Sequence, residues 1–212
     1  SIWGLIFLSL LVSSGYMIYQ AFTRGKHTKF IKNTSVWFIV ANLGTGLWVV
    51  AWLYEFTGMS VVLMFLVLAK LLKLIINNDM EIWDAPFKVI AFYWWPICIY
   101  SGWIAVASIA NMAAWLTEIG WDGAVFSEAE WTVIMIGVAV IINLLMIYLR
   151  NMREFAAVGV WALVAIYIRH QGTEELIAQT ALAGSILIFL NIAYHGYVNR
   201  KTNPMYKMLG KA

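Results

Sequence analysis

Long apolar runs separated by short polar segments make up almost the whole chain. A helix of about 20 apolar residues crosses a bilayer core. Membrane β-strands would be about 10 residues long and would alternate in polarity, which these runs do not. The pattern therefore predicts an all-α, polytopic transmembrane bundle with seven spans: about Ile2 to Phe22, Ser35 to Phe56, Ser60 to Ile76, Ala85 to Leu116, Ser127 to Leu149, Glu154 to Ile168 and Glu174 to Val198.

Three of these spans carry helix-start signals. Asp84 is placed to cap the fourth helix, with Pro86 in its first turn. Ser127 and Glu130 have the spacing of a capping box at the start of the fifth. Thr173 is placed to cap the seventh. These signals predict where the helices begin.

The charged residues support the count of seven. With seven spans, 13 of the 14 Lys and Arg residues fall on one side, and only Arg169 falls on the other. The positive-inside rule makes the basic side cytoplasmic, which puts the C-terminus inside. Lys70 and Lys73 lie near the inner end of the third span, from which they can extend to the interface. We place the protein in a bacterial inner membrane.

Composition agrees with the membrane class. Mean hydropathy is +0.79. Charged residues make up 12% of the chain, against about 25% in soluble domains. The net charge of +3 is small and gives no reason to expect nucleic acid as a partner.

The fourth span has an unusual face. Residues 92–116 contain no charge, and Pro96 predicts a kink near the inner end. At helical spacing, one face combines aromatic, small and amide side chains. Such a face suits a cavity wall or a close contact with another helix, and the sequence leaves both open. Its members are Tyr100, Trp103, Ala107, Asn111 and Trp115, with Ser108 beside them.

The search for catalytic chemistry is mostly negative. The chain has no Gly-rich phosphate loop, no H-x-x-x-H and no C-x-x-C. Cys98 is the one cysteine and is interpreted as a small buried hydrophobe. His195, near the inner end of the last span, is a haem-ligand candidate but is more simply an interfacial residue. We therefore expect no enzyme activity and no metal site. The amides of Asn143 and Asn191 are expected to bond between helices.

The fourth span also carries a family resemblance. The pattern Trp103-x3-Ala107-Ser108-x2-Asn111-x3-Trp115 resembles the last core helix of the TspO/MBR family, the tryptophan-rich sensory and translocator proteins. The family pattern there is W-x3-A-[ST]-x2-N, often followed four residues on by Trp.

Two other spans resemble the family less closely. Ile2-Trp3-x3-Phe7 is similar to V-W-x3-Y, and residues 42–48 are similar to L-N-x2-W, with Thr45 in the place of the Asn. By this resemblance residues 1–116 form a TspO-like core of four spans. The first core helix and its W-x-P-P loop would lie before Ser1. Residues 117–127 are an outer loop, 128–198 a three-helix C-terminal extension and 199–212 a basic cytoplasmic tail.

The resemblance implies a cavity for a lipophilic or planar ligand. A porphyrin, haem or another tetrapyrrole, a sterol, a carotenoid or a lipid would suit it. The implied partners are the bilayer, this small molecule and a second copy of the chain in a homodimer. The residues implied for binding are Trp3, Phe7, Asn42, Trp48, Trp52, Tyr100, Trp103, Ala107, Ser108, Asn111 and Trp115.

Two other functions stay open. The chain could be an accessory subunit of a larger membrane complex, with its small-residue and amide faces as interfaces. A transporter or a tetrapyrrole-degrading enzyme is disfavoured, because titratable groups within the spans are few.

Overall fold

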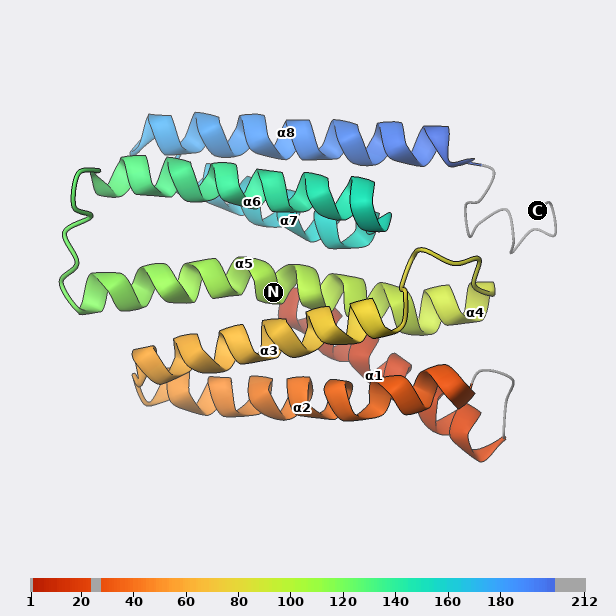
Figure 1. Cartoon of the computed structure of the whole chain (residues 1–212). Coiled ribbons are helices and arrows are strands. Elements are labelled where there is room, and N and C mark those ends of the chain that lie inside the picture. Colours follow the sequence, from red (N-terminus) through yellow and green to blue (C-terminus); the bar gives the residue numbers. More distant parts are fainter. Residues whose placement is uncertain (1, 24–27, 201–212) are drawn as a thin grey trace.

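The computed structural model describes residues 2–23 and 28–200, and these are helical apart from short connections (Figure 1). No strand occurs in the described part of the chain. The helices are α1 (Ile2–Phe22), α2 (Thr28–Leu53), α3 (Thr57–Asn77), α4 (Phe87–Val89), the π-helical turn η1 (Ile90–Trp94), α5 (Trp95–Glu118), α6 (Glu128–Arg150), α7 (Arg153–His170) and α8 (Glu175–Val198).

Six segments are long and apolar enough to cross a membrane: α1, α3, α6, α8, residues 36–53 of α2, and the continuous stretch from α4 to α5. This confirms an integral membrane protein with many helices. α7 is outside that set because its 18 residues include three charged side chains, Arg153, Glu154 and Arg169. The apolar part of α2 begins at residue 36, close to the predicted Ser35, and ends at Leu53 rather than Phe56; the helix itself extends back to Thr28.

The irregularity at Pro96 takes the form of a π-helical turn. Pro96 has no N–H to donate, and its ring crowds the carbonyl one turn earlier. The preceding residues Ile90 to Trp94 adopt the wider π spacing, and α5 then continues with Pro96 in its first turn. At the position of the predicted kink the structure therefore has a π-helical turn within one continuous helical segment.

Of the predicted caps, one is confirmed and two are wrong. Ser127 and Glu130 form the reciprocal capping box of α6. The residue before α4 is Pro86 rather than Asp84. The residue before α8 is Glu174, while the Thr173 hydroxyl donates to the carbonyl of His170. In both wrong cases the helix begins one or two residues later than expected.

The helices pack around α5, which runs through the middle of the bundle (Figure 1). One hydrophobic core joins α1, α2, α3 and α5 and takes in Phe155 and Val158 from the start of α7. A second core joins α6, α7 and α8 around Ile147, Leu163 and Ile188. α7 therefore contributes to both cores and holds the last three helices against α5.

The connections alternate between the two ends of the bundle (Figure 1). The α3–α4 connection and the α6–α7 turn lie together at one end, where Asn151 Nδ2 donates to the carbonyl of Glu81 at 2.9 Å. The long α5–α6 connection lies at the other end. The predicted basic tail falls mostly outside the described residues, as do Arg24, Lys26 and His27.

Two of the amides at membrane depth have different partners. Tyr148 donates its hydroxyl to Asn191 Oδ1, which joins α6 to α8 as expected. The expectation for Asn143 is wrong, because its Nδ2 donates to Ala139 of its own helix. The reason is space: a Cβ on Gly159 would lie 2.5 Å from Asn143 Oδ1, so the amide is pressed against the α7 backbone.

Candidate functional site

Five aromatic side chains from three helices meet on one side of the bundle, and we call them the aromatic cluster. The Trp3 ring lies 5.4 Å from Phe7 and 5.6 Å from Trp48, both nearly parallel to it, and 6.0 Å from Trp103, edge-on. Trp52 stacks on Trp48 at 6.3 Å. These are favourable aromatic geometries. The cluster therefore joins α1, α2 and α5 through ring contacts.

The aromatic cluster has a buried edge and an exposed edge. The indole Nε1 atoms of Trp48 and Trp103 are shielded from solvent and donate no hydrogen bond to a protein atom. At the other edge, Phe7 is 55% exposed and Trp52 44% exposed. This edge of the cluster therefore lies at the surface of the bundle.

Tyr100 lies on α5 outside the cluster and faces α2. Its hydroxyl is 2.5 Å from the hydroxyl of Thr45 and donates to the carbonyl of Ala41 at 3.2 Å. All three residues are buried. Tyr100 therefore joins α5 to α2.

Two predicted polar anchors are also engaged with protein. Ser108 donates its hydroxyl to the carbonyl of Ile104 in its own helix at 2.7 Å. Asn111 Oδ1 accepts a hydrogen bond from Ser60 Oγ on α3 at 3.0 Å, and both residues are buried. The alternative of a helix contact is the one realised at Asn111.

The other predicted residues divide in the same way. Trp115 lies against the start of α3, with its Nε1 3.1 Å from the position a Cβ would take on Gly58. Asn42 donates to Phe38 of its own helix. Ala107 follows Trp103 by four residues on α5 and packs against the first hydrophobic core. Five predicted residues thus form the aromatic cluster: Trp3, Phe7, Trp48, Trp52 and Trp103. Five others serve helix contacts or bond within one helix: Asn42, Tyr100, Ser108, Asn111 and Trp115.

Ser60 is the residue that sequence reasoning missed. It was treated only as the start of the third span, yet its hydroxyl is the partner of Asn111. A small polar residue near the end of one apolar run, with an amide in another, is the signal that could have suggested the pair. The Lys70 ammonium, expected to extend to the interface, lies 5.1 Å from the centre of the Trp37 ring of α2.

Comparison with known families decides the identity. The family model for TSPO-like protein matches residues 1–194. The chain belongs to the TSPO-like protein family. Neither the comparison with curated proteins nor that with solved structures gives a match. The TSPO-like assignment and the apolar helices together make this an integral membrane TspO-like protein.

Proposed function

We propose that this TSPO-like protein binds a lipophilic, planar molecule at the aromatic cluster and carries out no catalysis of its own. A porphyrin, haem or another tetrapyrrole is the preferred class, with a sterol, a carotenoid or a lipid as alternatives. The observation that carries the proposal is the meeting of Trp3, Phe7, Trp48, Trp52 and Trp103 in a cluster with one edge at the surface of the bundle.

The chemistry of the cluster suits such a ligand. A conjugated ring can stack on an aromatic face, and Phe7 and Trp52 are the exposed rings that stack on Trp3 and Trp48. A buried N–H without a partner costs about 1–3 kcal/mol, which an accepting ligand oxygen would recover. Trp48 and Trp103 supply two such donors. They therefore take the anchoring role first expected of Ser108 and Asn111.

The membrane topology is part of the proposal. α7 crosses the membrane as the seventh span, because it contributes to both hydrophobic cores and is joined to α6 and α8 by short connections at opposite ends. Its charged residues lie in its first and last turns, where side chains can extend to the interfaces. The C-terminus is then cytoplasmic, in a bacterial inner membrane.

The test is a titration of the purified protein in detergent with protoporphyrin IX, followed by tryptophan fluorescence. We expect saturable quenching at about one porphyrin per chain. Trp103→Ala should weaken binding about tenfold, since loss of one ring contact and one donor amounts to roughly 1.4 kcal/mol. Trp103→Phe should retain more affinity than Trp103→Ala, because it keeps a ring.

The matched control is Trp161→Ala. Trp161 is a tryptophan of α7 that is 58% exposed and lies outside the cluster, so its loss removes one fluorophore without touching the site. Equal affinities of Trp103→Ala and Trp161→Ala would contradict the proposal. If the protein instead purifies with unrelated subunits in a fixed stoichiometry and binds no porphyrin, it is an accessory subunit of a membrane complex. A ligand-binding protein would purify as a monomer or homodimer.

A further inference from the structure

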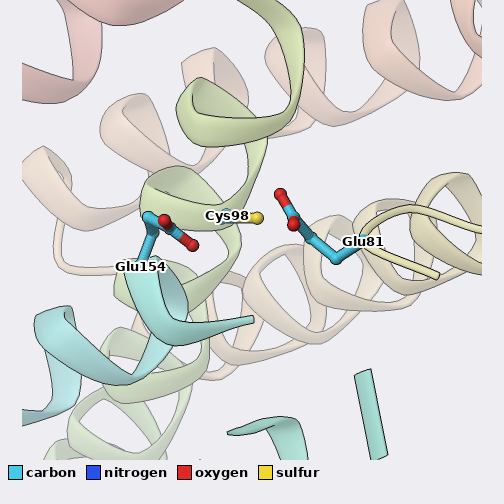
Figure 2. A group of neighbouring side chains, drawn as sticks. All are labelled: Glu81, Cys98 and Glu154. Atoms are coloured by element: carbon cyan, nitrogen blue, oxygen red, sulfur yellow. The ribbon is translucent and has the colours of Figure 1, made fainter. Parts of the chain in front are cut away.

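A thiol and two carboxylates converge at the end of the bundle that carries the α3–α4 connection. They come from three distant segments: Glu81 from that connection, Cys98 from the first turn of α5 and Glu154 from the first turn of α7. Figure 2 shows both carboxyl groups turned toward the sulfur. The Sγ atom and one oxygen of each carboxyl group lie within 4.8 Å of one another. None of the three belongs to the aromatic cluster.

The surrounding backbone fixes this convergence. Arg150 Nη2 donates to the carbonyls of Ile75 at 3.1 Å and Met80 at 3.4 Å, and Asn151 Nδ2 donates to the carbonyl of Glu81 itself. The end of α6 and the α6–α7 turn therefore hold the end of α3 and the α3–α4 connection as far as Glu81. Arg150 is occupied with these carbonyls through Nη2.

The surroundings of the Glu154 carboxyl group indicate a bound cation. The residue as a whole is partly buried. Its Oε2 is shielded from solvent and accepts no hydrogen bond. A buried carboxylate oxygen needs a proton, a donor or a cation. Arg153 near Glu154 and Arg150 near Cys98 favour the deprotonated form of each group, and the Trp95 side chain also lies beside the Glu154 carboxyl group. The enclosed oxygen still lacks a direct partner.

We propose that Glu81, Cys98 and Glu154 bind one zinc ion. Zn²⁺ accepts thiolate and carboxylate ligands together, at about 2.3 Å for sulfur and about 2.0–2.2 Å for oxygen. Ca²⁺ and Mg²⁺ prefer oxygen alone, so the buried thiol disfavours them. Tetrahedral ligands at those bond lengths lie about 3.5 Å apart, which small side-chain rotations here can reach. A water molecule completes the fourth position.

The zinc ion holds the start of α7, a helix that contributes to both hydrophobic cores, against α5. Cys98 binds as the thiolate and releases its proton to solvent. The ion then joins α5 and the α3–α4 connection to α7 at the cytoplasmic end of the proposed topology. The site is independent of ligand binding at the aromatic cluster, so either proposal can fail without the other.

The test uses the full chain without a histidine tag, purified in detergent, stripped with a chelator and reloaded with zinc chloride. After gel filtration, elemental analysis should find about one zinc per chain. Cys98→Ser and Glu154→Gln should each lower the bound zinc at least tenfold under limiting zinc. The matched control is Glu118→Gln, an exposed glutamate at the other end of α5, which should retain wild-type zinc.

Cobalt substitution keeps the test decisive if a variant fails to fold. Wild-type protein loaded with Co²⁺ should show a near-ultraviolet thiolate-to-cobalt charge-transfer band. The proposal is overturned by a cobalt-loaded wild type without this band, by a wild type that retains no zinc, or by folded Cys98→Ser and Glu154→Gln variants that retain as much zinc as the wild type.

Discussion

At the scale of single residues, two glycines of the bundle mark close helix contacts. Gly102 of α5 lies directly against α7, and Gly44 of α2 lies against Val67 of α3. The sequence left open whether such residues make room for a ligand or for a helix. At these two positions the structure shows a helix.

We expect Gly102→Ala to destabilise the protein. The new Cβ would lie 2.8 Å from the Phe155 carbonyl oxygen, which is backbone and cannot rotate away. Overpacking of this kind costs about 1–3 kcal/mol. The midpoint of thermal unfolding in detergent, followed by circular dichroism, should fall. Gly137→Ala on α6 is the control, since its Cβ meets nothing within 4 Å. Equal midpoints for the two variants would contradict the close α5–α7 contact.

The bond from Ser60 to Asn111 makes a second prediction at this scale. Both groups are buried, and Ser60 Oγ lies 3.0 Å from Asn111 Oδ1 across α3 and α5 and 2.7 Å from the Thr57 carbonyl of its own helix. In a double-mutant cycle with Ser60→Ala and Asn111→Ala, the coupling free energy should be about 0.6–1.7 kcal/mol. The measurement is the free energy of unfolding of the four proteins. If the effects of the two substitutions on the free energy of unfolding simply add, the two side chains are not coupled and Asn111 has another role.

At the scale of elements, helix starts differ in what fixes them. α6 begins at a capping box of local hydrogen bonds, with Ser127 Oγ 3.3 Å from the Glu130 amide and the Ser127 amide 2.8 Å from the Glu130 carboxylate. α4 begins after Pro86 and α8 after Glu174, both without a side-chain cap bond. Local sequence therefore determines the start of α6 more strongly than the other two.

Ser127→Ala should destabilise α6 by about 1 kcal/mol, because it removes the cap of an exposed helix start. The unfolding free energy in detergent measures this effect. Thr132→Ala is the control, since the Thr132 hydroxyl bonds only to the Glu128 carbonyl within the same helix. A Ser127→Ala protein as stable as the wild type would contradict the capping assignment.

Sequence reasoning predicted the helices much better than the contacts of their side chains. Apolar runs and the capping box are local features, so the all-helical fold and the start of α6 could be predicted from the sequence. The partners of Tyr100 and Asn111 depend on how α2 and α3 rotate against α5, which no local pattern specifies. The convergence of Glu81, Cys98 and Glu154 depends on three segments folding together and could not be predicted either.

At the scale of the whole molecule, the seven-span topology makes a prediction about sidedness. Cysteines introduced by Asp122→Cys and Thr173→Cys should react with a membrane-impermeant maleimide added outside cells, and Asp84→Cys should not. Cys98→Ser provides the background for all three variants. Asp122 and Thr173 lie on the same side only if α7 crosses the membrane. Labelling of Asp122→Cys without Thr173→Cys would contradict the seventh span.

The central claim is that the aromatic cluster of this TSPO-like protein holds a planar ligand. The most direct measurement is the amount of protoporphyrin IX that stays with the protein through gel filtration in detergent, determined from absorption. We predict about one porphyrin per chain for the wild type and for Trp161→Ala, and a severalfold loss for a Trp48→Ala, Trp103→Ala double variant of wild-type helicity. Equal retention by all three proteins, or none by the wild type, would contradict the claim.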